Sequence, residues 1–147
     1  MSLFHNNGNG ISKNDEFYTY AKDWEAIGEW IPNDKVVWEP FSNVENLEGV
    51  NHLYTITQEL KFATGDFFDN NEGEVVVSNP PFSIKKEILE RLKELEKPFI
   101  LLLPVLTLQN KYFHRIFEGG KDIQVIYPTR KIFFYRYDEK GQKIKVD

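Results

Sequence analysis

The sequence predicts an α/β domain whose mostly parallel sheet is covered by helices on both faces. Its 147 residues are enough for one domain with a sizeable core. β-favouring segments alternate with amphipathic helical segments, which is the order typical of parallel sheets. Segment Pro98–Leu103 is continuously apolar, like strands buried on both faces of such a sheet. We expect a flexible arm rich in Asn and Gly at residues 1–13, followed by a single domain at residues 14–147.

The first half of this domain contains one predicted helix and three predicted strands. Apolar residues recur at helical spacing over Ala21–Trp30, and Pro32 ends the pattern. The runs Lys35–Trp38 and Asn51–Thr57 favour β structure, and Phe62–Thr64 predicts a very short third strand. The stretch between the first two strands is expected to be a loop.

The second half contains two further helices and ends in a hairpin. Lys85–Leu95 has its apolar residues on one face, and so does Leu108–Phe117, which Gly119–Gly120 ends. The remaining β-favouring segments are Glu74–Val77, Pro98–Leu103, Ile123–Tyr127, Ile132–Tyr137 and Lys143–Val146. The last two of these segments flank Asp138–Gly141, a turn sequence suited to a hairpin.

Composition excludes several classes of protein. The chain has no cysteine, which rules out a disulfide framework and thiolate chemistry, and its three scattered histidines do not indicate a metal site. The longest uncharged apolar stretch, Pro98–Leu108, is well short of the ~20 residues that span a bilayer. No secretory signal is visible. We therefore expect a soluble, cytoplasmic protein that has no membrane partner.

The charge is distributed unevenly along the chain. The net charge is −5, which does not indicate a dedicated nucleic-acid binder. Residues 107–147, however, carry nine Lys and Arg against five Asp and Glu. This basic end is either an ordinary solvated surface or an edge that faces phosphates. The aromatic residues that alternate in the predicted hairpin are likewise open to two interpretations, sheet packing or contact with bases and phosphates.

Ligands of parallel α/β sheets bind beyond the carboxyl ends of the strands, where the strand order reverses. Four predicted strand ends carry informative residues: Glu39-Pro40-Phe41, Gly65-Asp66-Phe67-Phe68, Ser78-Asn79-Pro80-Pro81-Phe82 and Leu103-Pro104. In the third segment, two consecutive prolines fix two φ angles and remove two N–H donors. The Asn79 side-chain oxygen and the Pro80 carbonyl can accept two hydrogen bonds from one amino group, and Phe82 offers a ring on which a planar base can stack. The alternative is a rigid turn without such a role.

The segment Ser78-Asn79-Pro80-Pro81-Phe82 resembles the (Asn/Asp/Ser)-Pro-Pro-(Tyr/Phe) signature of S-adenosylmethionine (SAM)-dependent amino methyltransferases. The resemblance implies a Rossmann-like methyltransferase fold and an adenine-specific DNA methyltransferase that acts on N6 of a flipped base. Asn79, Pro80, Pro81 and Phe82 would form its catalytic loop, in which positioning rather than a strong base promotes attack on the methyl carbon. The same loop serves enzymes that methylate RNA bases or protein glutamine.

Other segments resemble the same family in the same order along the chain. Asn14–Thr19 is similar to its N-terminal cofactor motif, Glu39–Phe41 to part of its first loop, and Asp66–Phe67 to the pair that binds the SAM adenine. The cofactor residues implied are Phe17, Tyr18, Thr19, Glu39, Pro40, Phe41, Asp66 and Phe67. Asp15 as a helix N-cap and Asp66 as a turn residue are the simpler alternatives. Compact adenine-methylase-like proteins of bacteriophages and prophages show the nearest likeness.

The sequence departs from the family pattern at three places. Ser42 and Asn43 stand where the family has glycines that let the backbone approach the cofactor. Only Glu59 follows the second strand as a candidate ribose-binding acid. A separate DNA-reading domain is absent, and the chain ends just after the hairpin, so the fold is expected to be minimal or C-terminally incomplete. The resemblance therefore implies DNA as partner, with a homodimer or partner subunit possible, or else a catalytically inactive binding module.

Overall fold

The computed structural model describes residues 17–41, 59–62 and 66–146, and for 59–62 it describes the backbone alone. Its centre is a four-stranded parallel sheet in the order β3-β2-β4-β5. The strands are β2 (Val36–Glu39), β3 (Glu59–Phe62), β4 (Val75–Ser78) and β5 (Phe99–Leu101). β3 lies on one side of β2 and β4 lies on the other. The strand order thus reverses between β2 and β4, which is where parallel α/β sheets bind ligands.

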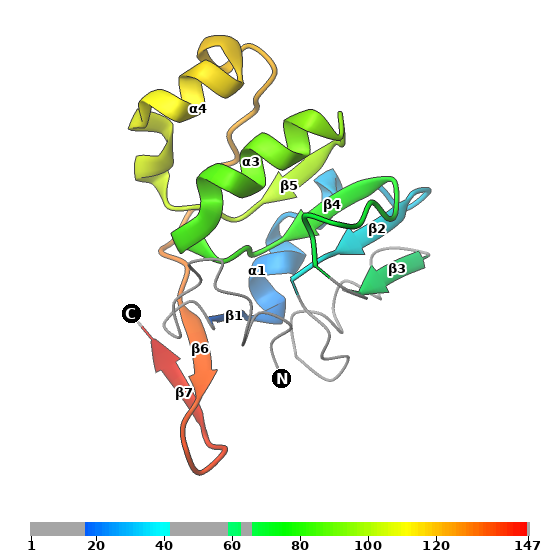
Figure 1. Ribbon diagram of the computed structural model, residues 1–147. Helices are drawn as coiled ribbons and strands as arrows, with labels where there is room; N and C mark the ends of the chain where they lie inside the picture. The colour runs from blue at the N-terminus through cyan, green and yellow to red at the C-terminus, as the bar shows by residue number, and fades with distance from the viewer. Residues whose placement is uncertain (1–16, 42–58, 63–65, 147) are drawn as a thin grey trace.

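Helices cover both faces of this sheet, as the sequence predicts (Figure 1). On one face lies α1 (Ala21–Ala26), followed by a 3₁₀ helix at Gly28–Trp30, and on the other lies α3 (Lys85–Glu94). The core on the α1 face consists of Trp24, Ile31, Val37, Val75 and Val77. The core on the α3 face consists of Trp38, Phe67, Val76, Ile84, Ile88 and Leu92. Adjacent residues of β2 and β4 therefore enter opposite cores, because strand side chains alternate.

A third core lies outside α3. There α4 (Lys111–Ile116) packs on α3, and Leu89, Phe113 and Phe117 form the buried centre of the contact. A 3₁₀ helix at Val105–Gln109 precedes α4. After α4 the chain turns at Gly119 and Gly120, whose φ angles of +75° and +86° confirm the predicted glycine stop.

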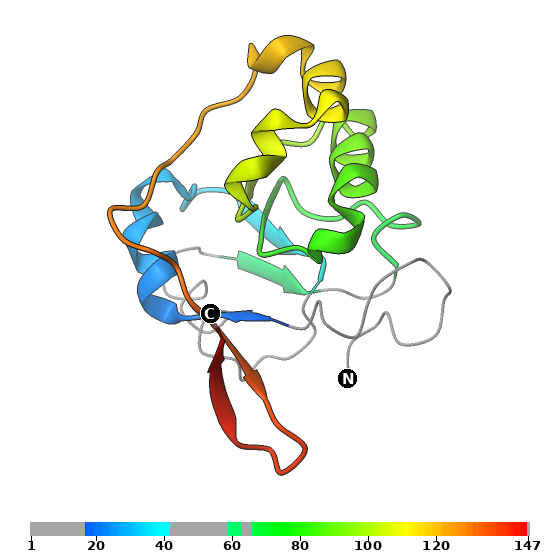
Figure 2. The same ribbon diagram turned by 90° about the vertical axis from the view of Figure 1, so that its left-hand side faces the viewer.

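A separate antiparallel sheet joins the two ends of the described chain. Its order is β1-β6-β7, with β1 at Tyr18–Thr19, β6 at Phe134–Tyr137 and β7 at Lys143–Val146. The predicted hairpin is therefore confirmed, and it projects below the parallel sheet (Figures 1 and 2). The expectation of a single mostly parallel sheet is only partly met, since β1 and the hairpin pair with each other rather than with β5.

The predicted strand Ile123–Tyr127 is wrong. This segment pairs with no other described strand, and Val125 and Tyr127 are 50% and 70% exposed. Its apolar run favours β structure, but a strand also needs a hydrogen-bonded neighbour and a buried face. The segment instead forms part of the connection between α4 and β6 (Figure 1), and Pro128 at its end cannot donate to a ladder.

Several boundaries differ from the predicted ones. The helix predicted at Ala21–Trp30 is a short α-helix and a 3₁₀ turn, and the helix predicted at Leu108–Phe117 begins only at Lys111. β5 has three half-buried residues instead of a fully buried run, because it is the last strand of the sheet within the described chain. The predicted strand Asn51–Thr57 and the arm at 1–13 lie outside the described residues.

Candidate functional site

The loop after β4 begins at the point where the strand order reverses. Glu39 ends β2 and Ser78 ends β4, so the carboxyl ends of the two strands meet there. The Ser78 hydroxyl donates a hydrogen bond of 2.7 Å to Oε1 of Glu39, and both side chains are buried. The Phe41 N–H donates to the same oxygen at 3.1 Å. Glu39 therefore ties the first loop to the Ser78–Phe82 loop.

Burial has the largest effect on the pKa of Glu39. Desolvation raises its pKa from 4.5 to about 8, although the hydrogen bonds from Ser78 and from Phe41 oppose the rise. At neutral pH the carboxyl group is mostly protonated, and it then has a proton to donate as well as an oxygen that accepts. A neutral Glu39 is consistent with its buried position at the carboxyl end of β2, where an unpaired charge would be costly.

The two prolines fix the path of the Ser78–Phe82 loop. Pro80 and Pro81 are both buried, and the chain passes from them into a 3₁₀ helix at Phe82–Ile84 and then into α3. Pro81 has φ −61° and ψ 120°, an extended conformation that precedes the helical turn. The prolines therefore hold Asn79 and Phe82 at a fixed spacing between a buried strand and a long helix.

The amide of Asn79 has a defined orientation. Its Nδ2 group donates a hydrogen bond of 3.1 Å to the Phe17 carbonyl oxygen, so Oδ1 points away from that contact. Within the described part of the chain, no hydrogen bond uses Asn79 Oδ1 or the Pro80 carbonyl oxygen. Both predicted acceptors of the loop are thus left without a donor by the described chain.

Aromatic rings from three distant segments lie beside Asn79. Phe134 of β6 lies 6.3 Å from Phe82, edge-on at 81°, and 6.4 Å from Phe17, tilted at 50°. We call Phe17, Phe82 and Phe134 the aromatic group. The sequence alone does not predict Phe134 at the site, because only the pairing of β1 with β6 brings it there. The alternation of aromatic residues in the hairpin was the one signal that pointed toward it.

The predicted cofactor residues of the N-terminal segment separate onto two faces of β1. Thr19 pairs with Phe134 and lies on the same face as Phe17, whereas Tyr18 packs among Tyr135 and Tyr137 on the other face. Thr19 is only 6% exposed, and its Oγ1 has no hydrogen-bond partner among the described residues. A buried hydroxyl without a partner is unusual, which makes Thr19 a candidate ligand group.

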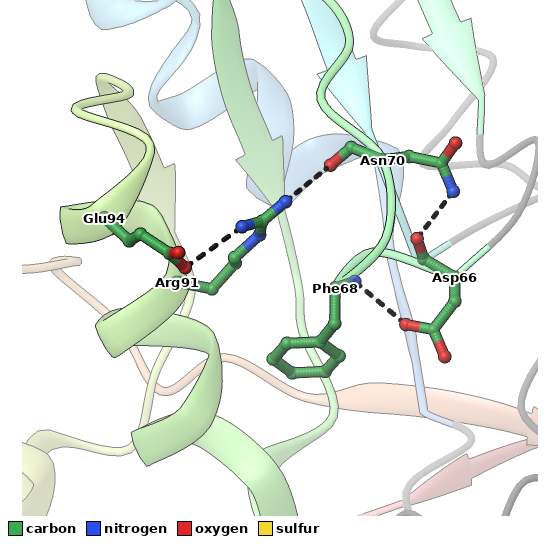
Figure 3. A network of polar contacts seen from close by, with 5 residues as sticks. All are labelled: Asp66, Phe68, Asn70, Arg91 and Glu94. Carbon is green, nitrogen blue, oxygen red and sulfur yellow. Dashed lines mark hydrogen bonds and ion pairs between the residues drawn. The ribbon is translucent and has the colours of Figure 1, made fainter.

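The Asp66 segment is held by a network that reaches α3 (Figure 3). Asp66 Oδ1 accepts a hydrogen bond of 2.9 Å from the Phe68 N–H, and Asn70 Nδ2 donates to the Asp66 carbonyl at 2.7 Å. Arg91 of α3 donates to the Asn70 carbonyl at 3.4 Å and pairs with Glu94 at 3.0 Å. Asp66 therefore has the turn role that was its simpler alternative, and binding of an adenine amine stays a prediction.

Phe67 occupies the core and not the surface of the site. It is 0% exposed, and its ring lies 5.5 Å from Trp38 and 5.0 Å from Phe41. The rings of Phe41 and Phe68, which pack against Phe67, are half-buried and so are more exposed than Phe67. The predicted stacking of Phe67 on a ligand ring would require the side chain to leave this core. Pro40 is fully buried as well.

The structure thus brings Asn79, Pro80 and Phe82 together with Phe17, and it places Glu39 behind them. Asn14–Glu16, Ser42, Asn43 and the Glu59 side chain lie outside the described residues, so their predicted roles stay predictions. Among the residues described, no group of three His, Asp or Glu side chains is placed to hold a metal ion, and no helix is long and apolar enough to cross a membrane.

Comparison of the chain with protein-family models, with curated proteins and with solved structures gives no match.

Proposed function

We propose that this protein transfers a methyl group from SAM to an exocyclic amine, and that the amine is N6 of adenine in DNA. The observation that carries the proposal is the orientation of Asn79. The Phe17 carbonyl accepts from Asn79 Nδ2 at 3.1 Å, which leaves Oδ1 and the Pro80 carbonyl as two acceptors beside the rings of the aromatic group. Two acceptors and a ring are what an amine attached to a planar base requires.

The residues of the loop act by positioning. Asn79 Oδ1 and the Pro80 carbonyl each accept one hydrogen of the amine, which favours a tetrahedral nitrogen with its lone pair directed at the methyl carbon. Phe82 stacks on the base, and Phe134 supports Phe82 at its edge. A base in a duplex must first leave its stack, at a cost of a few kcal/mol. No strong general base is needed, because the amine proton is lost after the nitrogen has become positively charged.

The chain offers a partial set of groups for SAM, which supplies the methyl group when it is bound. The Thr19 hydroxyl is buried without a partner in the described chain, on the face of β1 that carries Phe17. Phe41 and Phe68 are half-buried rings near Asp66. The Thr19 hydroxyl fits a polar group of SAM, and the rings of Phe41 and Phe68 fit its aromatic part.

The proposal is tested by incubating the protein with labelled SAM and unmethylated DNA, and then digesting the DNA to nucleosides. The product expected is N6-methyladenine. Asn79→Ala should lower the rate of transfer by about 100- to 1,000-fold, the cost of losing one positioned hydrogen-bonding group at a reacting centre, with little change in SAM affinity. Asn110→Ala is the matched control, because Asn110 lies at the start of α4 and its amide makes only local contacts.

RNA and a glutamine-containing protein serve as further substrates in the same assay. Label in one of these substrates and not in DNA would support the proposed role of Asn79 and Pro80 in holding an amine. It would change the class of substrate. Absence of label from every substrate, or an Asn79→Ala variant that is fully active, would contradict the proposed role of the loop.

A non-catalytic binding module is the second candidate, and the burial of predicted cofactor side chains favours it. Glu39 and Phe67 are turned into the protein, where they contact Ser78 and Trp38. Calorimetric titration with SAM and with its demethylated product separates the two candidates. Micromolar binding supports the enzyme, and the absence of binding at millimolar concentration supports the module.

A further inference from the structure

We propose that the face of the β6–β7 hairpin that carries Phe134 and Arg136 binds the DNA backbone next to the target base, with Arg136 on a phosphate. The inference rests on the proposed function for the position of the base. It adds the element that holds the DNA strand, which no part of the Asn79 site supplies. The two faces of the hairpin differ in what their side chains contact.

The register of the hairpin assigns its side chains to two faces. Phe134 pairs with Val146, Tyr135 with Lys145, Arg136 with Ile144 and Tyr137 with Lys143. Paired residues share a face and successive residues alternate. One face therefore carries Phe134, Arg136, Ile144 and Val146, and we call it the Arg136 face. The other face carries Tyr135, Tyr137, Lys143 and Lys145.

On this second face, which we call the tyrosine face, Tyr135 packs within the protein, whereas Tyr137 is 44% exposed. Tyr135 is fully buried against Tyr18 and Tyr20, with ring centroids 5.5 Å and 4.9 Å away. The Lys143 ammonium lies 4.1 Å from the centroid of the Tyr135 ring. This face therefore attaches the hairpin to β1 and α1, and its aromatic residues have the packing role that was the simpler interpretation.

The Arg136 face is open and adjoins the candidate site. Phe134 contacts Phe82 and Phe17 at the inner end of the hairpin. Arg136 and Ile144 follow toward the tip, and both are exposed. No described carboxylate lies within ion-pair distance of Arg136, whereas Arg130, Arg91 and Arg115 each have an acidic partner. Arg136 is thus a cation held on a strand without a counter-charge from the described chain.

The spacing of the face matches a nucleic-acid strand. Two residues along a β-strand cover about 6.6–6.8 Å, and successive nucleotides of one DNA strand rise by about 3.4 Å. Arg136 lies two residues beyond Phe134, the ring that supports Phe82, and therefore reaches a phosphate about two nucleotides away. The surroundings are basic as well, since residues 130–146 contain six Lys and Arg but only two acidic residues. Arginine also binds phosphate oxygens through two parallel hydrogen bonds.

The test measures how DNA binding by the full chain depends on salt concentration. Binding is monitored by the fluorescence anisotropy of a labelled duplex and of its single strand. Arg136→Ala should weaken binding and lower the slope of log affinity against log salt by about 0.9 for the duplex, or about 0.7 for the single strand, as expected for one lost phosphate contact. Arg136→Lys should restore the slope, because it keeps the charge. Arg115→Ala removes one charge from α4, a helix that lies at the opposite end of the molecule from the hairpin (Figures 1 and 2), and should leave the slope unchanged.

The result separates this inference from the proposed function. A slope that is the same in wild-type protein and in Arg136→Ala, or a chain that does not bind DNA, overturns the inference even if methyl transfer is observed. A slope that falls in Arg136→Ala but not in Asn79→Ala supports it even if no methyl group is transferred. Equal slope losses in Arg136→Ala and Arg115→Ala would mean that only net charge matters and would also overturn it. Stronger binding to an RNA strand than to either DNA would contradict DNA as the partner.

Discussion

Glu39 joins the ends of β2 and β4 at the centre of the candidate site, and its protonation makes the stability of the protein depend on pH. Its pKa is about 8 in the folded chain and 4.5 when desolvation is absent. Between these values the folded state binds more protons than the unfolded state, so the contribution of Glu39 to stability is full below about pH 4.5 and is lost as the pH rises toward 8. The loss is at most about 1.4 kcal/mol for each pH unit.

Glu39→Gln should remove this dependence. The Gln oxygen can still accept from Ser78 and from the Phe41 N–H, so the fold is retained. We expect the difference in unfolding free energy between the variant and wild type to grow in favour of the variant as the pH rises from about 4.5 to 8. Urea denaturation at a series of pH values measures it. A difference that is constant over this window would show that the carboxyl group is not desolvated as described.

At the residue scale, the sequence predicts the local chemistry of a segment better than it predicts which side chains are buried. The stiffness of Asn79–Phe82 follows from two adjacent prolines, and the structure places this loop at the reversal of strand order. The burial of Phe67 does not follow from its neighbours in the sequence, because Trp38 and Phe41 reach it from another strand end. The approach of Phe134 to Phe82 likewise depends on a pairing between the two ends of the described chain.

At the scale of elements, Gly73 shows how a turn sets the spacing between two strands. It precedes β4 with φ +62°, and a Cβ atom there would lie 2.8 Å from the Trp38 Cβ and 3.0 Å from the Val36 carbonyl oxygen. The Glu74 N–H donates to that same carbonyl at 2.8 Å, so the turn cannot move away without losing a bond to β2. Lys97 adds hydrogen bonds of 2.8 Å and 2.7 Å to the carbonyls of Glu72 and Gly73.

Gly73→Ala should destabilise the protein more than Gly141→Ala. Both glycines have positive φ, but a Cβ at Gly141 would meet nothing within 4 Å. Gly141→Ala should cost only the conformational strain, about 1–2 kcal/mol, whereas Gly73→Ala should add about 1–3 kcal/mol for overpacking. Denaturant midpoints with unchanged slopes measure the difference. Equal losses of stability in the two variants would mean that the turn at Gly73 accommodates the added Cβ atom without a cost in free energy.

The sequence correctly predicts elements that have a strong internal pattern or a local turn, such as α3 and the hairpin, but not those that depend on a distant partner. α3 has its buried residues Ile88, Leu89 and Leu92 on one face, so its period appears in the sequence. Ile123–Tyr127 has the composition of a strand but no neighbour in the described chain, and composition does not specify a neighbour. β1 contains only two residues and exists because β6 pairs with it, so no local signal could predict it.

For the whole molecule, the ion pair between Asp23 and Arg130 joins the α1 face to the antiparallel sheet. Arg130 lies 2.7 Å from Asp23 Oδ1, and the Asp23 side chain is 3% exposed. Its other oxygen is buried and has no hydrogen-bond partner within the described part of the chain. The carboxylate therefore depends on Arg130, which follows the connection from α4 and precedes β6.

Arg130→Ala should destabilise the whole chain by about 1–3 kcal/mol, because it leaves a buried acceptor without its partner. The double variant Asp23→Asn with Arg130→Ala should lose less than the sum of the two single changes, since the residues share one interaction. Arg115→Ala, whose partner Glu90 is 3.9 Å away and exposed, should change stability by at most about 0.5 kcal/mol. Additive losses in the double variant would show that Asp23 and Arg130 are not coupled.

The turn at the tip of the hairpin sets the register between β6 and β7. Asp138 Oδ1 accepts hydrogen bonds of 2.9 Å and 2.8 Å from the Lys140 and Gln142 N–H groups, and Gly141 takes φ +75° to close the turn. A slip of one residue between β6 and β7 would turn every side chain of the slipped strand to its opposite face. Because β1 holds β6 in place, β7 is the strand that would slip, and Ile144 and Val146 would change places with Lys143 and Lys145. The four-residue turn Asp138–Gly141 therefore determines which side chains of β7 lie beside Phe134 and Arg136.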